Sequence, residues 1–285
     1  MPSQNKPYHL IAGTHHVVGY SPDGDSIQFR ANQKKHWDLL PRQPKLNKSD
    51  HTRLRFEAVD ALETHYHGGS QPRKYADLAL DFMLDKVGID HTKVVWGATE
   101  NEVVDAPDGT KGYIITQDTD GKFQRPVAFV FAGKPQHKDG SKVTLTPALV
   151  RKSVNYKLLA AGLAYPTYYT SMTDPMILDE MTQATVSARS QSKGFWPSDS
   201  TGKGVAMSLK AIQEQHLILP KLFRRMFDFL KTGNSPSQFK AWLAGMKNRV
   251  VIRATRQVKK LEDVIIQKGT KVKLLYLPEE LLFYP

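Results

Sequence analysis

The alternation of hydrophobic and polar residues predicts a β-strand over Arg53–Glu63. Leu54, Phe56 and Ala58 share one parity of this run, and mostly charged residues occupy the other. A period of two is typical of a half-buried strand. The end of the run is unusual, because structural strands usually finish in Gly, Asn or Pro. It gathers one cation and two carboxylates, which are Arg55, Asp60 and Glu63. Taken alone, this segment favours a solvated strand end slightly over a functional site.

Further alternating runs predict a β-rich N-terminal region. Tyr8–Ala31 is predicted to form strand, turn and strand, with Pro22-Asp23-Gly24 as the turn, since proline presets φ and glycine accepts a positive φ. Lys34–His51 is polar and basic and is predicted to be an inserted loop. A hairpin is predicted at Lys268-Gly269-Thr270. Other short strands are predicted at 92–96, 112–117, 126–131, 250–252, 264–266, 272–276 and 281–284.

Hydrophobic spacing of three and four residues predicts helices between and after these strands. One helix is predicted from Pro72 to Gly88. A long helix is predicted from Thr146 to Ala161, with Thr at the N-cap, Pro in the first turn and Gly just past the end. Further helices are predicted at 174–192, at 207–231 with an interruption at Pro220, and at 239–247.

A change of composition at Ser198–Gly204 predicts a linker between two domains. The predicted domains are residues 1–198 and a smaller C-terminal extension, residues 205–285, in which helices precede short strands. A chain of 285 residues is long enough for one large domain with such an appendage.

The composition narrows the class of protein. An apolar content of 40% and a charged content of 24% are ordinary for a soluble globular protein, and no stretch approaches the length of a membrane span. The chain has no cysteine, which excludes disulfides, thiolate zinc sites and cysteine nucleophiles. Its first residues lack the apolar core of a signal peptide, so we expect a cytoplasmic protein, or a secreted one if the chain is a trimmed mature form.

The net charge of +12 is concentrated in the C-terminal extension. Residues 201–285 hold 16 Lys and Arg against 6 Asp and Glu. A basic segment of this kind suits a polyanion, most simply nucleic acid. Two interpretations of the extension stand about equal. It is either an accessory nucleic-acid-binding module, or an appendage that packs on the first domain or mediates self-association with its basic face solvated.

Three separated features suit one chemistry. A tight turn carries Asp25, the strand end described above carries two more carboxylates, and Arg125 precedes an apolar strand. Two carboxylates make a hard oxygen site for Ca²⁺ or Mg²⁺. Two arginines grip a phosphate and stabilise the charge that develops on it, and a further carboxylate takes a proton from water. This combination suits hydrolysis of a phosphodiester.

The same residues carry a resemblance to the staphylococcal nuclease (thermonuclease) family. Asp23-Gly24-Asp25-Ser26 is similar to the family's Asp-Gly-Asp-Thr. Arg55–Glu63 lines up without a gap on Arg-Leu-x-Gly-Ile-Asp-Ala-Pro-Glu. Arg125 stands before an apolar strand as in the third motif, Val154–Ala164 resembles Val-Asn-x-x-Leu-Val-x-x-Gly-Leu-Ala, and Gly194-Phe195-Trp196 resembles the closing Gly-x-Trp. Each motif alone is weak, but five in order over roughly residues 8–197 make a strong resemblance.

The resemblance implies an α+β fold, a five-stranded OB-type β-barrel capped by helices. It also implies a metal site. Asp25 and Asp60 resemble the family's calcium carboxylates, and Ala61 would lend its backbone carbonyl. The bound ion would be calcium, or another divalent cation in its place. Ala61 stands where the family also has threonine, which removes a hydroxyl from the site. Leu62 in place of proline is expected to loosen the turn that aims Glu63.

The remaining site residues follow from the same resemblance. Glu63 resembles the general base or water-positioning group, and Arg55 and Arg125 resemble the phosphate clamps. Lys122 and Tyr168 are similar to positions where the family contacts a terminal phosphate or stacks on a base. The implied activity is a calcium-dependent nuclease that cleaves DNA, RNA or both. Water attacks phosphorus in line and the bond to the 5′-oxygen breaks.

Two alternatives stand beside the enzyme. A catalytically inactive nucleic-acid-binding module on the same fold predicts that the charged site residues are eroded, and none is. The other alternative is a carbohydrate- or peptide-binding barrel in which these charged residues form structural ion pairs. Surface ion pairs add little stability to a fold, which makes so many charged residues in one place hard to explain. The expected partner is nucleic acid. No membrane or protein partner is implied, and the oligomeric state, the choice of DNA or RNA, and the endo or exo mode stay open.

Overall fold

The computed structural model describes residues 7–99, 102–172 and 174–284. Contacts between residues divide the chain into two compact units. Unit 1 consists of residues 1–57, 79–158 and 173–180, and unit 2 of residues 58–78, 159–172 and 181–285. The chain therefore passes between the units several times. Within the described ranges, no helix has the length and apolar character that a membrane span requires.

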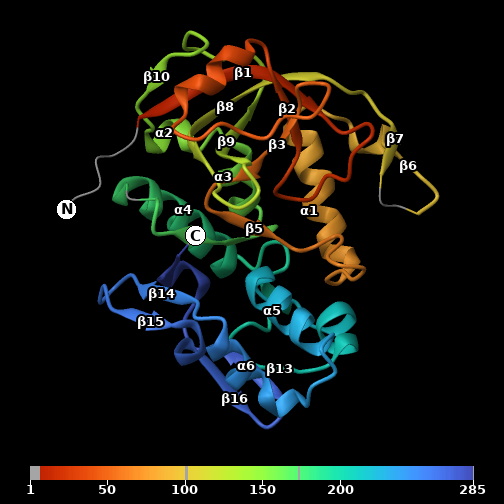
Figure 1. Ribbon diagram of the computed structural model, residues 1–285, viewed down its shortest axis with the longest axis vertical. Coiled ribbons are helices and arrows are strands. Elements are labelled where there is room, and N and C mark those ends of the chain that lie inside the picture. The colour runs from red at the N-terminus through yellow and green to blue at the C-terminus, as the bar shows by residue number, and fades with distance from the viewer. Residues whose placement is uncertain (1–6, 100–101, 173, 285) are drawn as a thin grey trace. The chain divides into compact units, whose positions relative to one another are not determined.

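Unit 1 is built on a seven-stranded sheet that curves into a nearly closed barrel (Figure 1). Its strands are β1 (Tyr8–His16), β2 (Gln28–Ala31), β3 (Thr52–Arg53), β4 (Arg55–Phe56), β8 (Thr110–Thr119), β9 (Pro126–Ala132) and β10 (Lys142–Val143). The order is β3-β2-β1-β8-β9-β4, with β10 beside β1. Neighbours are antiparallel except β4 and β9, which are parallel. A small hairpin of β6 (Val95–Trp96) and β7 (Val103–Asp105) adds to the unit. The predicted α+β fold with an OB-type barrel is confirmed.

The single strand predicted over Arg53–Glu63 is wrong, because the chain leaves the sheet within it. The run is divided into β3, β4 and β5 (Val59–Ala61). Ala58 lies between the last two with φ of 68°, a left-handed conformation that glycine adopts more easily. After this turn β5 pairs with β11 (Ala164–Pro166) in unit 2. The alternation ends at Phe56, and every residue from there to Glu63 is buried.

The long helix predicted from Thr146 to Ala161 is two helices. They are α2 (Pro147–Val150) and α3 (Val154–Ala160). The Ser153 hydroxyl donates to the Val150 carbonyl at 2.6 Å and accepts from the Tyr156 amide at 3.1 Å. A serine that bonds nearby backbone in this way competes with continuous helix, which explains the break. Hydrophobic spacing alone did not reveal it.

Asn155 connects α3 to the sheet of unit 1. Its side-chain oxygen accepts from the Val130 amide at 2.9 Å, and its amide nitrogen donates to the carbonyls of Glu57 and Ala128 at 2.9 and 3.0 Å. The residue is fully buried, so these bonds satisfy backbone groups where β4 ends beside β9. This contact gives a structural reason for the Val-Asn motif of the sequence.

Of the remaining helices, three agree with the predicted positions to within a few residues, and α5 (Pro220–Leu230) begins well after the predicted start at residue 207. The three are α1 (Arg73–Lys86), α4 (Pro175–Ser190) and α6 (Phe239–Gly245). Short 3₁₀ segments span Lys34–Leu39, His91–Lys93, Trp196–Ser198, Pro236–Gln238, Leu261–Val264 and Pro278–Glu280, and a π-helical turn spans Ala211–Gln215. In the predicted helical run 207–231, only the second half is α-helix, because α5 begins at the proline that was expected to interrupt the run.

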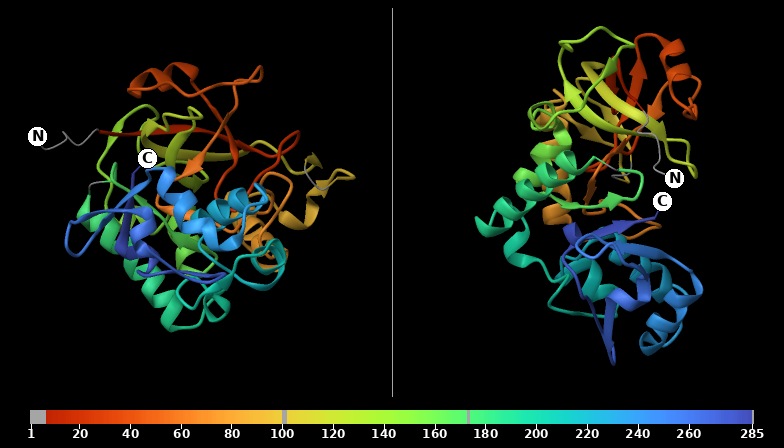
Figure 2. Two further views of the ribbon diagram at one scale, coloured as in Figure 1. Left: turned by 60° about the horizontal axis from the view of Figure 1, so that its bottom comes forward. Right: turned by 90° about the vertical axis from the view of Figure 1, so that its left-hand side faces the viewer.

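Within the described residues, unit 2 holds three small sheets besides its helices, and the strands after residue 245 are the blue ones in Figure 2. Its other strands are β12 (Tyr168–Tyr169), β13 (Val205–Ala206), β14 (Arg249–Ile252), β15 (Val258–Lys260), β16 (Ile265–Lys268), β17 (Lys271–Leu274) and β18 (Leu281–Phe283). The sheets are ordered β11-β5, β12-β18-β14-β15 and β13-β17-β16. The predicted hairpin at Gly269 is confirmed, since Lys268 pairs with Lys271.

One hydrophobic core joins the C-terminal segment to the nuclease-like motif. Leu62 is fully buried in a cluster that contains Phe223 and Phe227 of α5 and residues of β14, β17 and β18. The predicted linker Ser198–Gly204 is also packed, because Thr201 is buried and its hydroxyl accepts from the Leu219 amide at 2.9 Å. Whether residues 205–285 fold as a separate domain stays a prediction, but their core includes residues of the motif.

His15 makes the stability of unit 1 dependent on pH. Its ring is fully buried, Nε2 lies 3.1 Å from the Phe131 carbonyl, and Nδ1 has no hydrogen-bond partner among the described residues. Burial lowers the pKa of His15 from 6.5 to about 4. Between these values the unfolded chain binds a proton that the folded chain does not bind, so stability falls as pH falls. We expect a loss of about 3 kcal/mol from pH 6.5 to about 4 from this group.

The pH dependence can be measured by urea unfolding across this range. His15→Gln should flatten the slope, whereas the exposed control His137→Gln should keep the slope of the unaltered protein. An unchanged slope in His15→Gln would show that other groups cause the acid sensitivity.

Candidate functional site

Asp60 and Glu63 converge on a single cation, the guanidinium of Arg224 in α5. Nη1 of Arg224 lies 3.1 Å from Oδ1 of Asp60, and Nη2 lies 2.8 Å from Oδ2. Nη1 also pairs with Oε1 of Glu63. All three residues belong to unit 2, and both carboxylate residues are buried. The turn after β5 therefore aims Glu63 at the same point as Asp60, even with Leu62 in place of the motif's proline.

Local pairing holds the first carboxylate in place. Asp60 lies in β5 opposite Tyr165 of β11, and Ala61 lies opposite Ala164. The Thr167 amide donates to the Ala58 carbonyl at 3.0 Å, which fixes the start of this short ladder. Because side chains alternate along a strand, the pairing determines the direction of the Asp60 side chain.

Gln71 holds the backbone of Glu63. Its amide donates to the Glu63 carbonyl at 2.9 Å, and its side-chain oxygen accepts from the Glu63 amide at 3.3 Å. The same side chain donates to the Ile218 carbonyl at 2.8 Å. Gln71 is fully buried. One side chain thus connects the second carboxylate of the motif to the segment just before α5.

The loop between Glu63 and Gln71 packs against α5. The Tyr66 hydroxyl donates to Asp228 at 3.0 Å, and His67 Nδ1 lies 3.5 Å from the same carboxylate. A Cβ on Gly69 would come within 2.4 Å of the Phe227 ring, so glycine permits this close approach. His67 is exposed and paired with Asp228.

Burial and the neighbouring carboxylates act in opposite directions on the charge of Arg224. Burial would lower the pKa of Arg224, but the charges of Asp60 and Glu63 outweigh it and raise that pKa well above its usual value. Lys221, one turn earlier, donates to the Tyr169 hydroxyl at 3.2 Å, and burial lowers the pKa of Lys221. Removing one partner of a buried ion pair is costly because the other charge stays without compensation.

The carboxylate oxygens of Asp60 and Glu63 are ligands of the kind that bind a divalent cation. Two carboxylates at one point are the hard oxygen ligands that calcium prefers, and here they already surround a positive charge. Asp60 uses both oxygens and Glu63 uses Oε1 on Arg224. Arg224 and a metal ion would therefore compete for the same oxygens. The third predicted carboxylate, Asp25, belongs to unit 1.

In unit 1, the backbone brings the regions of Asp25, Arg55 and Arg125 together. The Asp25 carbonyl accepts from the Phe56 amide at 3.0 Å, which places the turn beside β4. Arg55 in β4 pairs with Val127 of β9, two residues after Arg125. The turn and the two arginines, far apart in sequence, thus meet at one edge of the sheet.

Arg125 is fixed by the turn that precedes it. Its Nε donates to Oδ2 of Asp120 at 2.8 Å, and its guanidinium carbon lies 5.1 Å from the centre of the Phe123 ring. Burial would raise the pKa of Asp120, but hydrogen bonds from Arg125 and the Phe123 amide outweigh it and lower that pKa. Lys122 is exposed on the same turn with Nζ 4.9 Å from the Phe123 ring centre.

Tyr168 is a core residue of unit 2 and not the base-stacking residue that the sequence predicted. Its ring is fully buried, its hydroxyl lies 3.1 Å from the Thr182 hydroxyl, and the Arg253 guanidinium lies 5.4 Å from the ring centre. Tyr168 belongs to β12, which pairs with β18. A base has no access to a ring held in this way.

Among the described residues, Asp85, Asp90 and His91 form a cluster of groups that could hold a metal ion. His91 Nδ1 lies 2.8 Å from Asp85, and Asp90 accepts from the Thr92 amide and hydroxyl. These bonds close the loop after α1, and the three residues are exposed or half-buried. A structural role explains this cluster.

Sequence reasoning missed Arg224. It lies 164 residues from Asp60, in a basic segment that holds many other cations. Its place on α5 among buried residues was the available signal, but nothing in the pattern connected it with the motif.

Comparison with protein families agrees with the motif analysis. The family model described as staphylococcal nuclease homologue matches residues 53–198, just over half of the chain. The match includes Asp60, Glu63 and Arg125, while Asp25 and Arg224 lie outside it. Comparison with curated proteins gave no match. The chain therefore belongs to the family of staphylococcal nuclease homologues.

Proposed function

We propose that this protein is a metal-dependent nuclease that hydrolyses phosphodiester bonds in DNA, RNA or both. The observation that carries the proposal is the convergence of Asp60 and Glu63, two buried carboxylates of the family's motif, on one cation. A structural pair needs only one carboxylate for one arginine. Two carboxylates at one point create an excess of negative charge that a divalent ion neutralises.

In the proposed reaction, water attacks phosphorus in line and Glu63 accepts a proton from that water. Arg55 and Arg125 hold the phosphate and stabilise its growing negative charge. The bond to the 5′-oxygen breaks and this oxygen takes a proton from solvent, which leaves a 3′-phosphate and a 5′-hydroxyl. Calcium, when bound by Asp60 and the Ala61 carbonyl, would supply further positive charge to the phosphate.

Arg224 must leave the carboxylates for this reaction to proceed. Its guanidinium occupies the point at which Asp60 and Glu63 meet. The protein with Arg224 in place is therefore the proposed resting state, and displacement of Arg224 is the proposed step that readies Glu63.

The contact of Arg224 also favours a second candidate function. If Arg224 replaces the metal permanently, the protein is a catalytically inactive module that binds nucleic acid on the same fold. The two candidates differ in whether the Asp60–Glu63 site ever exchanges its arginine for a metal ion.

Cleavage assays separate these candidates. The purified full chain should cut denatured DNA in millimolar calcium and leave 3′-phosphate ends, and EDTA should abolish the cleavage, since the metal supplies charge that the two arginines alone do not. Gel analysis of end-labelled DNA measures both results. Absence of cleavage in millimolar calcium would contradict the nuclease proposal and favour the inactive module.

A further inference from the structure

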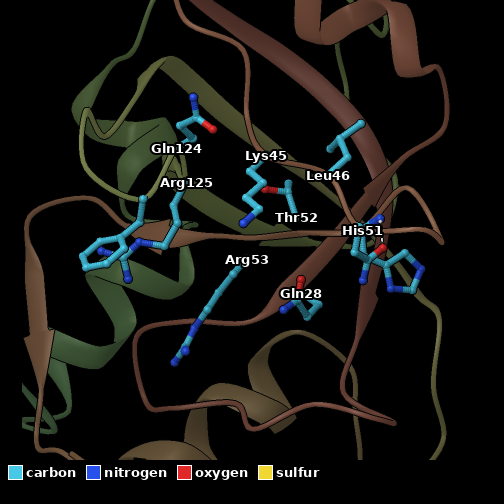
Figure 3. A pocket seen from close by; sticks show the side chains of 10 residues that line it. Gln28, Lys45, Leu46, His51, Thr52, Arg53, Gln124 and Arg125 are labelled. Carbon is cyan, nitrogen blue, oxygen red and sulfur yellow. Dashed lines mark hydrogen bonds between the residues drawn. The ribbon is translucent and has the colours of Figure 1, made fainter.

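Two histidine rings from different elements of unit 1 lie face to face. One is His16, at which β1 ends, and the other is His51, the last residue of the inserted loop before β3. The ring centres are 4.1 Å apart and the planes differ by 23°, so the rings are stacked. His51 also lines a groove between this loop and the barrel, and Figure 3 shows its side chain there with those of Lys45 and Arg125. The stack therefore connects β1 to one wall of the groove.

Hydrogen bonds fix the orientation of the His16 ring. Its Nδ1 lies 2.7 Å from Oδ2 of Asp108, and its Nε2 lies 2.8 Å from the Thr14 hydroxyl. The other oxygen of Asp108 accepts from the amides of Val17 and Val18, at 2.6 and 3.2 Å. An ionised carboxylate only accepts hydrogen bonds, so Nδ1 of His16 carries a hydrogen already in the neutral ring. A further proton is added at Nε2, on a ring whose positive charge Asp108 balances.

The contacts of His51 suit a neutral ring. Its Nδ1 lies 2.9 Å from the Tyr20 hydroxyl, which accepts from Nδ2 of Asn47 at 2.7 Å. In a neutral ring Nδ1 accepts the one hydrogen that the Tyr20 hydroxyl donates. A proton on Nδ1 removes this acceptor. Within the residues that the structure describes, His51 makes no hydrogen bond to a carboxylate that would balance the new charge.

A positive charge on both rings is unfavourable in the stack. Two charges at a ring-centre distance of 4.1 Å repel each other. Burial and the positive charges of His16 and Arg30 lower the pKa of His51 from 6.5, and the carboxylates of Asp108 and Asp50 oppose this shift in part. The released loop therefore binds a proton more readily than the docked loop. Docking loses stability as the pH falls below about 6.5.

The other charged groups around the stack are not histidines that titrate in this range. Asp50 pairs with Lys34 at 2.6 Å, which lowers the pKa of Asp50. Arg30 belongs to β2, the strand beside β1. His15 precedes the stacked residue of β1 in sequence, but burial lowers the pKa of His15 to about 4, so it stays neutral in mild acid. Mild acid therefore acts on the two stacked rings.

The fastenings at the start and middle of the inserted loop respond differently to acid. His36 lies with Nδ1 2.9 Å from Oδ1 of Asp139. A proton on His36 turns this contact into a charge-assisted hydrogen bond, so it is not weakened. Arg42 makes two hydrogen bonds with Asp118, at 2.9 and 3.0 Å, and this contact involves no histidine. Acid therefore loosens the end of the loop and spares its start.

We propose that the stack of His16 on His51 is an acid-sensitive latch, which holds residues 47–51 on the barrel at neutral pH and releases them below about pH 6. Asn47 and His51 both line the groove, so their release removes part of its wall. The start of the loop stays docked. The latch does not depend on the proposed nuclease activity, because it is a property of the loop itself.

Hydrogen exchange of the full chain at about pH 7 and about pH 5, corrected for the intrinsic exchange rate, tests the latch. The amides of Asp50 and His51 bond to the Asn47 carbonyl and side chain, at 3.1 and 3.0 Å. Their protection should fall about tenfold or more between these pH values, since one unit of pKa difference corresponds to a factor of ten. The amides of His36 and Leu40, bonded within the start of the loop, should keep their protection.

Variants that cannot take a proton test whether His51 is the group responsible. His51→Phe keeps a ring against His16, and His51→Gln keeps an acceptor for the Tyr20 hydroxyl. Protection of residues 47–51 should be independent of pH in both variants. The control His137→Gln removes an exposed histidine of the same unit and should retain the tenfold change.

Three results would each overturn the latch. One is protection of residues 47–51 that does not change with pH in the unaltered protein. Another is a pH dependence that persists in both variants of His51. The third is an equal loss of protection at Ile114 and Ile115, which lie in the middle of β8, because the whole unit would then open together.

Discussion

Replacing Glu63 with Gln is expected to lower the rate of calcium-dependent cleavage by about 10²- to 10⁴-fold, the usual contribution of a general base. The amide keeps the size of the side chain and can still accept from Arg224, but it cannot take a proton from water. Rates under single-turnover conditions on end-labelled denatured DNA measure the effect.

The matched control for this variant is Glu214→Gln, which removes a carboxylate exposed in the same unit. It should cleave at the rate of the unaltered protein. Thermal unfolding of both variants separates loss of chemistry from loss of fold. Unchanged cleavage by a folded Glu63→Gln protein would assign the observed activity to another group or to a contaminant.

Replacing Arg224 with Met is expected to destabilise the metal-free protein and to strengthen its binding of calcium. Without the guanidinium, Asp60 and Glu63 face each other as buried like charges, which should cost about 3–5 kcal/mol of unfolding free energy in EDTA. Calcium no longer has to displace an internal cation. Its apparent dissociation constant should fall by about tenfold or more.

Calcium titrations followed by thermal unfolding and by calorimetry measure both effects. Arg256→Met removes one positive charge from an exposed position in the same unit and should alter neither stability nor calcium affinity. If Arg224→Met is as stable as the unaltered protein in EDTA, the ion pair contributes no net stability. If it is destabilised but gains no calcium affinity, the two carboxylates serve Arg224 alone and the inactive module is the better description.

The barrel and the local motifs were predictable from sequence because they depend on short-range patterns. Only a few neighbouring residues determine the turn that carries Asp25 and the caps at the helix ends. The order of the motifs along the chain then indicated the fold. The break at Ser153 was missed because hydrophobic spacing continues through it while a hydroxyl competes for the backbone. The turn at Ala58 was missed because alanine itself gives no sign of a positive φ, although the family's motif has glycine at this position.

The occupant of the carboxylate site was beyond sequence reasoning for a different reason. Arg224 reaches Asp60 and Glu63 only after the C-terminal segment has packed against the motif through Leu62 and Phe227. That packing is tertiary and leaves no periodic signal along the chain. Tyr168 failed as a prediction in the same way, since strand β18, which pairs with β12, comes from the far end of the sequence.

The bridge that Gln71 makes between Glu63 and Ile218 has an evolutionary consequence. A substitution at Gln71 or Leu62 disturbs a partner in the C-terminal segment, and a substitution in α5 disturbs the motif. Selection that preserves Asp60 and Glu63 therefore also acts on residues outside the segment that the family model matches. Among close relatives, we expect the tail and the motif loop to be inherited together and to vary in concert, so that exchanging one between relatives without the other yields a poorly folded chimera.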